Sequence, residues 1–410
     1  MSEWIGVEQA CERLGVKQAT LYAYVSRGVL TRRKTDGRSV FDAAEIEALA
    51  RRGRPRRRAG TTDLVIESAI TMLGEDRHYY RGRDAIELAA TWRLEDVAAW
   101  LWTGEAEPGE RAPFAARPEG LAAARDAQRG LPAGVLPLER LHVIVAAMAA
   151  ADPVRLNFEP AAVQRTGTAI LGGMVDALPD PGARKPRRPL VPELHVRLWR
   201  KLAGDGADDR LEDVLRFAMV LLADHELASS TLAARVAASV RADPYAVVTA
   251  GLGVVSGALH GGASLGVEAL LAEIDEPHRA AHAIGERLRR GERISGFGHA
   301  VYKGGDARGE ALLDRLRRTM PGNPRLAVAD ALLREAAHHS LPPMNVDFAL
   351  GLLTHLAGMP RGAGEAIFGI ARTAGWLAHA IEEYTSPTRL RLRASYTGPF
   401  RGAEVDTVGT

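Results

Sequence analysis

The sequence predicts a mainly α-helical protein with a small, separate module at its N-terminus. Apolar residues recur at three- and four-residue spacing in stretches such as 85–102 and 211–223, which is the pattern of helices packed on a core. Residues 1–50 instead combine short helices, a glycine turn and a hairpin signal. With 410 residues, the chain is long enough for two or three domains.

Positive charge is concentrated at one end of the chain. Residues 1–60 hold 13 Lys and Arg against 7 Asp and Glu, a net charge of +6, and the other residues hold 40 against 44, a net charge of −4. An acidic partner is therefore expected for the N-terminal end only. A single cysteine, Cys11, permits no intrachain disulfide, and no apolar run is long enough to cross a membrane. We expect a soluble, cytoplasmic protein without membrane contact.

The first 26 residues predict a helix-turn-helix. Two amphipathic stretches, 4–14 and 17–26, flank Gly15-Val16. The second helix of such a pair can lie in the major groove of DNA. Such a module can equally serve protein contacts, so both uses remain open.

Residues 31–41 predict a wing, because basic residues there precede the hairpin signal Asp36-Gly37. Residues 42–50 are expected to form a closing helix. The letters VEQACERLGVKQATLYAYVSRGVL and FDAAEIEAL resemble winged-helix regulators of the mercury-resistance-regulator and excisionase type. Six arginines between Arg51 and Arg58 follow, and they could either neutralise DNA phosphates or form a solvated linker.

Two histidines stand beside glycines where the helical periodicity breaks. His260 lies in ALHGGAS and His299 in GFGHAVYK. Glycine lets the backbone turn sharply and approach a ligand. Asp347 begins another apolar helix, and with the two imidazoles it can form an acid–base set. The alternatives are solvated or structural histidines, and a helix N-cap role for Asp347.

A polar triplet, Asp224-His225-Glu226, ends the apolar helix predicted at 211–223. Burying three titratable groups is costly unless they are paired or used in chemistry. The triplet therefore indicates either a functional site or a surface turn between two helices.

From about residue 65 to 399 the chain resembles the citrate synthase family of bacterial type. The matching segments are YYRGRDAIELAATWRLEDVAAWLWTGE, ADHELASST, LHGGA, GFGHAVYKGGDAR, NVDFALG and GIARTAGWLAHAIE. The resemblance implies the citrate synthase fold, a large helical domain with a small helical domain. The expected divisions are the winged module 1–50, the Arg-rich linker 51–60, the large domain 61–257 and 352–410, and the small domain 258–351.

The resemblance also implies roles for individual residues. Asp347 is expected to be the base, His260 to hold the enolate oxygen, and His299 to polarise the carbonyl of oxaloacetate. The other expected substrate-binding residues are His225, Arg308, Arg372 and Arg391.

Two further expectations concern coenzyme A and the oligomer. Coenzyme A is expected to contact the turn at Gly296 and Gly298, and Lys303. In a homodimer, Arg391 would enter the active site of the other subunit. Arg389–Arg393 alternates charged and apolar residues, which predicts a strand with its three arginines on one face.

The sequence departs from the family pattern at several places beside the expected site. Leu222 stands where histidine is frequent, and alanine or serine replaces the usual asparagine twice. A proline is missing twice, from the DPR and RPRA elements. The five positions are Leu222, Ala228, Ser264, Ala307 and Leu392. None removes an expected catalytic group, but the first three leave room for a different substrate.

The resemblance implies a citrate synthase of the tricarboxylic acid cycle. Such an enzyme condenses acetyl-CoA with oxaloacetate and hydrolyses the citryl thioester, with no metal or permanently bound cofactor and with acetyl-CoA as co-substrate. The nearest alternative is a 2-methylcitrate synthase that uses propionyl-CoA. A third interpretation is a DNA-binding regulator whose synthase-like body senses a metabolite.

Overall fold

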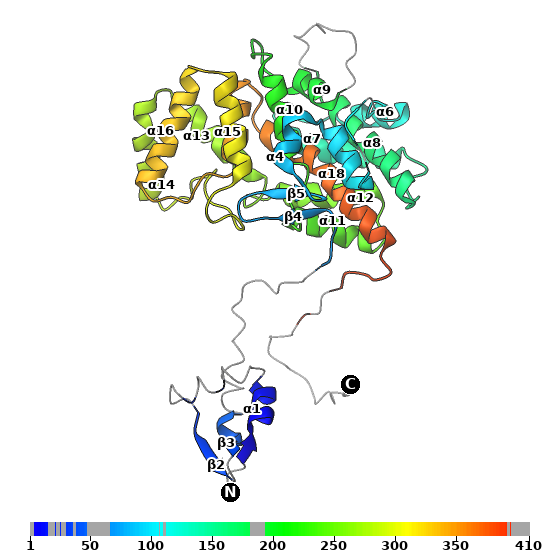
Figure 1. The fold of residues 1–410 in the computed structure, drawn as a ribbon. Helices are drawn as coiled ribbons and strands as arrows, with labels where there is room; N and C mark the ends of the chain where they lie inside the picture. The colour runs from blue at the N-terminus through cyan, green and yellow to red at the C-terminus, as the bar shows by residue number, and fades with distance from the viewer. Residues whose placement is uncertain are drawn as a thin grey trace, which may run out of the picture. The chain divides into compact units, whose positions relative to one another are not determined.

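The computed structural model of the chain describes residues 4–14, 21, 25, 30–35, 38–46, 66–105, 107–109, 112–180, 193–391 and 394. The chain divides into two compact units, Met1–Glu67 and Ser68–Thr410 (Figure 1). Each unit has its own hydrophobic core, built from residues of that unit.

The first unit contains a three-stranded antiparallel sheet in the order β1-β3-β2. Its elements are β1 (Trp4–Gly6), α1 (Val7–Leu14), β2 (Arg32–Thr35) and β3 (Arg38–Asp42). The hairpin predicted over 31–41 is therefore confirmed, although its turn, Asp36-Gly37, lies outside the described residues. The helix expected from residue 4 is wrong at its start. Ile5 pairs with Phe41, and burying both side chains favours a strand there.

The other helices of the first unit are described only in part. Leu21 and Val25 are helical, and the rest of the expected 17–26 helix lies outside the described residues. The expected closing helix is described as helical over 43–46. Thr31 binds Glu45 twice, through its backbone N–H at 2.6 Å and its hydroxyl at 2.9 Å. These bonds tie the first strand of the wing to the closing helix.

The second unit begins with a small antiparallel sheet of β4 (Thr71–Leu73), β5 (His78–Tyr80) and β6 (Arg83–Asp84). The single helical stretch expected at 85–102 is two helices, α4 (Ala85–Thr91) and α5 (Leu94–Thr103). Trp92 is extended, and Asp96 accepts the backbone N–H of Arg93 as the cap of α5. Gly104 ends α5 in the left-handed conformation, with φ of +75°.

A bundle of helices packs around one long central helix, α18 (Ala363–Thr385). Its residues 363–380 are buried on every side, as expected for a helix that is apolar all round. In Figure 1, α18 (orange) lies against helices that precede it by more than 100 residues. The surrounding helices are α6 (Pro118–Ala127), α7 (Pro137–Ala150), α8 (Pro160–Asp176), α9 (Leu194–Leu202), α10 (Leu211–Leu221), α11 (Ser229–Ser239) and α12 (Pro244–Val255).

The remaining helices of the second unit gather at one side of it, where Figure 1 labels α13 to α16. They are α13 (Gly262–Glu273), the short 3-10 helix η1 (Pro277–Arg279), α14 (Ala280–Arg289), α15 (Ala307–Thr319), α16 (Pro324–His338) and α17 (Val346–Leu356). The division at 258 and 351 into a small and a large domain stays a prediction.

Two further observations concern the chain as described. Arg389–Arg391 forms no strand, contrary to the alternating pattern, and the rest of that segment, Leu392 and Arg393, lies outside the described residues. A strand needs a partner strand for its backbone groups, and none lies beside Arg389–Arg391 among the described residues. None of the described helices is long and apolar enough to cross a membrane.

Candidate active site

The triplet after α10 is largely buried, so it is not a surface turn. Asp224 is fully buried and His225 is 6% exposed. The hydroxyl of Tyr80 lies at the centre of this segment, where it donates to the carbonyl of Val220 at 3.0 Å and accepts the N–H of Asp224 at 3.2 Å. Glu226 follows with φ of +51°, a left-handed conformation that turns the chain away. Tyr80, the last residue of β5, therefore holds the segment from Val220 to Asp224 in place.

The ring of Tyr302 contacts both His225 and His299. The Nε2 atom of His225 lies 2.9 Å from the hydroxyl of Tyr302, and the ring of His299 stacks on Tyr302 with centroids 4.8 Å apart. The two imidazole centroids are 5.3 Å apart. The pKa of His225 is lowered by burial and by the Arg308 charge. The site therefore holds two adjacent, neutral imidazoles.

The hydrogen bonds of His299 indicate which of its nitrogens is free to act. Its Nδ1 accepts the backbone N–H groups of Val301 at 3.1 Å and Tyr302 at 3.2 Å. Because Nδ1 accepts both groups, the proton of the neutral ring belongs on Nε2. In this tautomer the 3.4 Å contact between Nε2 and Nη2 of Arg308 joins two donors and is not a hydrogen bond. Burial and Arg308 lower the pKa of His299 to about 4. Nε2 can thus donate to a ligand oxygen at neutral pH.

The glycines before His299 permit a loop that reaches α17. Gly296 and Gly298 have φ of +88° and +81°, and a Cβ at Gly296 would lie 2.7 Å from a methyl group of Val267. Asn345 binds this loop twice, donating from its backbone to the carbonyl of Gly296 at 2.9 Å and from Nδ2 to that of Gly298 at 2.8 Å. Lys303 is exposed and donates to the carbonyl of His299 at 3.2 Å.

Arg308 is buried in a two-bond ion pair with Asp306, a residue that the sequence motifs did not single out. The distances are 2.9 Å from Nε to Oδ1 and 2.8 Å from Nη2 to Oδ2. The same Oδ2 accepts the backbone N–H of Val346 at 3.1 Å. Asp306 therefore links Arg308 to the first turn of α17, where Asp347 lies.

Asp347 is not the N-cap of α17, because Asn345 has that role and accepts the N–H of Asp347 at 3.0 Å. The Oδ1 atom of Asp347 is buried, and no described residue forms a hydrogen bond with it. Burial raises the pKa of this carboxyl to about 7, although the charges of Arg308 and Arg372 oppose the shift. A carboxylate with such a pKa can remove a proton near neutral pH.

His260 is linked to Arg372 through the ring of Phe368, which both side chains contact. Its Nε2 is 2.8 Å from Oγ of Ser230, which also accepts the indole N–H of Trp376 at 3.3 Å. Its ring meets Phe368 edge-on at 5.5 Å, and the guanidinium of Arg372 lies over the same Phe368 at 4.5 Å. Burial and Arg372 lower the pKa of His260 to about 4, so this imidazole is also neutral.

Arg372 is 1% exposed, and only part of its guanidinium group is hydrogen-bonded. Its Nε donates to the carbonyl of Leu222 at 2.8 Å, whereas Nη1 is buried without a partner. Burial lowers its pKa to about 10, which leaves the guanidinium charged at neutral pH.

Several buried polar atoms around these residues have no hydrogen-bond partner among the described residues. They are Nδ1 of His78, Oδ1 of Asp224, Oδ1 of Asp347, Nη1 of Arg372 and Oγ1 of Thr231. Leaving one such atom unpaired costs about 1–3 kcal/mol. Donors and acceptors gathered in this way indicate a site that a polar ligand completes. Arg391, by contrast, is exposed in the single chain.

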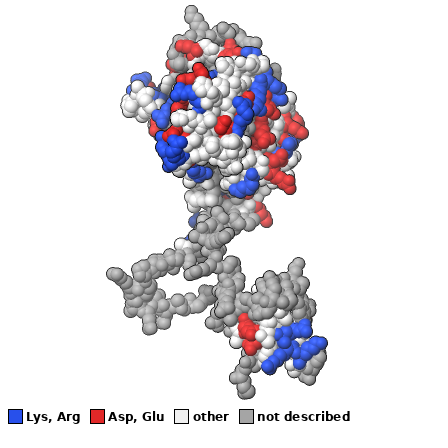
Figure 2. Space-filling view, turned by 90° about the vertical axis from the view of Figure 1, so that its left-hand side faces the viewer, with Lys and Arg blue, Asp and Glu red and all other residues white. Residues whose placement is uncertain are grey.

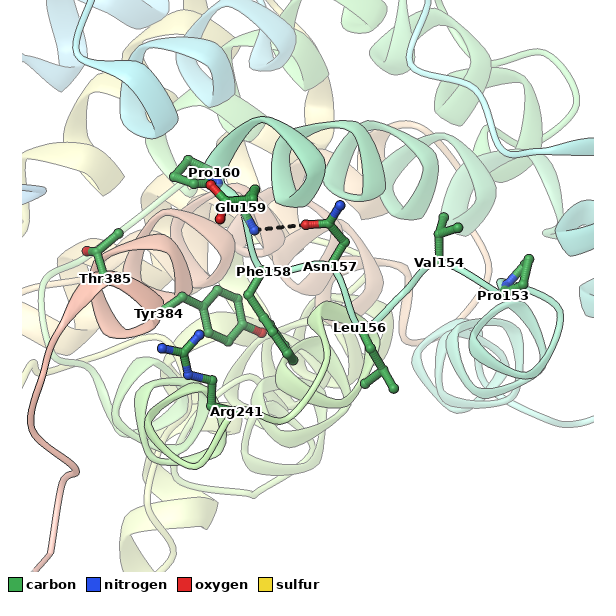
Figure 3. Close-up of a pocket in the computed structure, with 10 residues that line it drawn as sticks. All are labelled: Pro153, Val154, Leu156, Asn157, Phe158, Glu159, Pro160, Arg241, Tyr384 and Thr385. Carbon is green, nitrogen blue, oxygen red and sulfur yellow. Dashed lines mark hydrogen bonds between the residues drawn. The ribbon is translucent and has the colours of Figure 1, made fainter.

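A separate surface groove of about 660 Å³ lies away from these residues. Figure 3 shows Tyr384 and Arg241 beside Phe158, and Val154 and Pro153 farther along the same loop. It shares no lining residue with the predicted site. Within the described part of the chain, no group of three or more His, Cys, Asp or Glu side chains is arranged to hold a metal ion.

Family models match both parts of the chain. The model described as "Citrate synthase, C-terminal domain" matches residues 60–393, and a helix-turn-helix domain model matches residues 4–54. The first match covers most of the second unit, including every residue of the site described above.

Curated relatives carry two enzyme names. The chain is 30% identical to the citrate synthase of Haloferax volcanii over 366 residues, 82% of this chain and 94% of that protein. It is 29% identical to the 2-methylcitrate synthase of Mycobacterium tuberculosis over 381 residues, 88% of this chain and 95% of that protein. A match at 40% identity to citrate synthase 2 of Bacillus subtilis spans 44% of this chain and only half of that protein.

Solved structures agree with this relationship. Citrate synthase from Thermotoga maritima superimposes with a TM-score of 0.66 at 25% identity, over 84% of this chain and 96% of that one. Citrate synthase from Thermoplasma acidophilum shares the fold with a TM-score of 0.69 at 24% identity, over 84% and 97% of the two chains. The protein therefore belongs to the citrate synthase family, as an acyltransferase-type enzyme with an N-terminal helix-turn-helix domain.

Proposed function

We propose that the protein condenses acetyl-CoA with oxaloacetate and hydrolyses the resulting thioester to citrate and coenzyme A. The observation that carries the proposal is the unpartnered Asp347 carboxyl, which burial brings to a pKa of about 7 and which the charges of Arg308 and Arg372 reach. On this proposal the enzyme works in the cytoplasm and supplies the tricarboxylic acid cycle. The Thermoplasma acidophilum structure, described as a complex with carboxymethyl coenzyme A and oxaloacetate, supports the choice of substrates.

The first step makes a carbon nucleophile from the thioester. Asp347 takes a proton from the methyl carbon while His260 donates a hydrogen bond to the developing enolate oxygen. Ser230 accepts from Trp376, and on this proposal it gives its own hydrogen to Nε2 of His260. The imidazole proton is then on Nδ1, available for the enolate. An imidazole with a pKa of about 4 stays a neutral donor throughout.

The second step joins the two substrates. Nε2 of His299 donates to the ketone oxygen of oxaloacetate, and the enolate carbon attacks the ketone carbon. His225, Arg308 and the free Nη1 of Arg372 hold the carboxylates, since guanidinium groups donate paired hydrogen bonds to them. Water then cleaves the citryl thioester, and coenzyme A leaves as the thiol. Gly296, Gly298 and Lys303 are proposed to contact coenzyme A.

The proposed site straddles the proposed domain boundary. His299, Arg308 and Asp347 belong to residues 258–351, whereas His225 and Arg372 belong to the other part. Closure of the small domain 258–351 over the large one would bring its acid–base groups against His225 and Arg372 and exclude water.

The assay that tests the function is release of thiol by the full-length protein with oxaloacetate and either acetyl-CoA or propionyl-CoA. We expect the larger kcat/KM with acetyl-CoA. A preference for propionyl-CoA would assign the 2-methylcitrate reaction instead, as the substitutions Leu222, Ala228 and Ser264 allow. No release with either thioester would leave the metabolite-sensing regulator.

We also propose that the protein is a homodimer in which Arg391 of the partner subunit completes each site. The exposure of Arg391 in the single chain supports this. The test mixes two inactive variants, Arg391→Ala and Asp347→Asn, and allows subunits to exchange. A mixed dimer would then hold one intact site and regain thiol release. No recovery, with exchange verified, would mean that Arg391 serves its own chain or none.

A second proposed function is DNA binding by the first unit. Arg32, Arg33 and Lys34 lie on the exposed strand β2, and the guanidinium of Arg33 stacks 4.6 Å over Trp4. Figure 2 shows basic side chains gathered on one side of this unit. We expect the full-length protein to retard duplex DNA at low salt and to release it as salt rises. Replacing Arg32 and Lys34 with serine should weaken retardation without changing thiol release. No retardation by the parent protein at low salt would overturn this second proposal.

A further inference from the structure

A chain of buried, charged side chains leads to the residue before His225. Arg235 on α11 and His379 and Glu383 on α18 are at most 5% exposed, and Asp224 is fully buried. Nη2 of Arg235 lies 2.6 Å from Glu383, and its Nη1 lies 2.7 Å from Nδ1 of His379. Nε2 of His379 lies 3.3 Å from Oδ2 of Asp224.

The direction of these hydrogen bonds follows from the donors. A guanidinium can only donate, so Nδ1 of His379 accepts from Arg235. The imidazole proton is therefore on Nε2 and is donated to Asp224. Arg235 thus sets the tautomer of His379, and His379 binds the carboxylate of Asp224 as a donor.

Asp224 is held from several sides. Its Oδ2 also accepts the hydroxyl of Thr71 at 2.6 Å and the backbone N–H of Glu226 at 3.2 Å. Burial alone would raise the pKa of Asp224, but His379, Arg372 and Thr71 together lower it. The carboxylate is therefore ionised at neutral pH, and its orientation is determined by its partners.

One face of α18 supports the whole 222–225 segment. Arg372, Gly375 and His379 follow one another at spacings of three and four residues. Arg372 donates to the carbonyl of Leu222, and the backbone N–H of Gly375 donates to that of Ala223 at 3.0 Å. The approach is so close that a Cβ at Gly375 would overlap Oδ1 of Asp224.

The network continues to the first residues of the second unit. Glu382, next to Glu383, receives Nη1 of Arg235 at 2.7 Å and the backbone N–H of Ala69 at 2.9 Å. Ala69 follows the last residue of the first unit, Glu67, by two positions. The same charges therefore fix both the beginning of the second unit and the segment that carries His225.

We propose that His379 and Arg235 are positioning residues for oxaloacetate. By holding Asp224, they place the imidazole of His225 and the free Nη1 of Arg372 toward the same ligand. Neither His379 nor Arg235 touches that ligand. The inference rests on the proposed function, because it assigns the ligand as oxaloacetate.

The test compares two substitutions at one position with a matched control. His379→Leu removes the donor to Asp224, whereas His379→Gln can keep an N–H near Nε2. Arg216→Leu is the control, since Arg216 is a buried arginine of α10 that donates to the carbonyls of Ala89 and Trp92 and to none of the network's residues. KM for each substrate, kcat and the melting temperature are measured for all four proteins.

We expect His379→Leu to raise the KM for oxaloacetate about tenfold, the loss of one hydrogen bond to a charged group. The KM for acetyl-CoA should change less than about twofold. His379→Gln should recover most of the affinity, and Arg216→Leu should lower the melting temperature with the KM for oxaloacetate unchanged. If His379→Leu lowers the melting temperature but leaves that KM unchanged, the network is purely structural and the proposal is overturned.

Direct binding of oxaloacetate, measured by calorimetry, separates this inference from the proposed function. Should the parent protein neither bind oxaloacetate nor release thiol, the proposed function fails. Should the parent bind and His379→Leu bind equally well, only the positioning role fails. If His379→Leu does not fold, the near-isosteric Thr71→Val replaces it, because it removes one bond to Asp224 and should weaken binding in the same direction. Unchanged binding by Thr71→Val would then count against the proposal.

Discussion

At the scale of single residues, burial shifts the acids and bases of the site in opposite directions. It raises the pKa of Asp347 to about 7 and lowers those of His260 and His299 to about 4. The two directions have one cause. Burial disfavours the charged form, so it raises the pKa of a carboxyl group and lowers the pKa of an imidazole. Near neutral pH the carboxylate is therefore the group that titrates, and both imidazoles stay neutral.

The pH dependence of turnover should follow Asp347 alone. Since the base must be ionised, kcat/KM should rise about tenfold per pH unit below pH 7 and level off above it. Initial rates at limiting acetyl-CoA measure this profile. A slope of two logarithmic units per pH unit would mean that an imidazole titrates in the same range, contrary to the pKa values of His260 and His299.

The same residue should lower the stability of the protein. The folded-state pKa of Asp347 lies above its unfolded value near 3.9, so the folded state binds the extra proton and loses stability as pH rises toward 7. Asp347→Asn has no charge to bury. It should melt above the parent protein, by a margin that grows from pH 5 to pH 8, while losing thiol release. A margin that stays constant with pH would contradict the raised pKa.

Sequence motifs identify the residues of the site that lie in short patterns, but not those that support them. His260, His299 and Asp347 stand out because glycines or an apolar helix adjoin them. Ser230 and His379 give no such signal, because their partners are 30 and 155 residues away in the chain. Tyr302 and Asp306 lie inside a recognised motif, yet only the folded loop reveals what they contact.

At the scale of elements, helix packing in the second unit depends on a close approach of α12 to α18. A Cβ at Gly251 of α12 would lie 2.5 Å from the ring of Trp376, a fully buried residue of α18. A Cβ at Gly285 of α14 would have no atom within 4 Å among the described residues. Both glycines lie inside helices, so they form a matched pair.

Alanine at these two positions should act in opposite directions. Gly251→Ala should cost about 1–3 kcal/mol of unfolding free energy through overpacking against Trp376. Gly285→Ala should gain up to about 1 kcal/mol, the difference in helix propensity. Denaturant unfolding of the purified variants measures both values. Equal effects would show that propensity rather than packing decides the outcome at Gly251.

Apolar spacing predicts the helices of the second unit but not their breaks. Trp92 and Arg93 fit a helix by composition, and α4 and α5 separate there because Asp96 caps the backbone of Arg93. The prediction of a helix over Trp4–Gly6 fails because the sequence pattern is local. A three-residue strand becomes favourable only when β3 is present to pair with it, and local periodicity carries no information about a partner strand.

At the scale of the whole molecule, the two hydrophobic cores are independent. The first contains Ile5, Leu21 and Phe41 among others, and the second begins at Ile70. The change in composition after residue 50 indicates this organisation in the sequence. The two units divide at Glu67, and the winged module 1–50 and the linker 51–60 stay predictions.

Removing residues 1–60 should leave the enzyme intact. The shortened chain keeps Ala69 and its bond to Glu382, and it loses no residue of the second core. We expect kcat and both KM values within about twofold of the parent, since no hydrogen bond within the site is lost. Steady-state kinetics on the shortened protein test this. A large rise in the KM for oxaloacetate would mean that the first unit acts on the site.

The hydrogen bond from Trp376 to Ser230 has a practical consequence. Ser230 also contacts His260, so one oxygen atom separates this indole from the imidazole proposed to bind the enolate. A ligand that repositions the imidazole must alter the surroundings of an intrinsic fluorophore. The protein thus contains its own optical reporter, through which occupancy could be followed in real time without any attached dye.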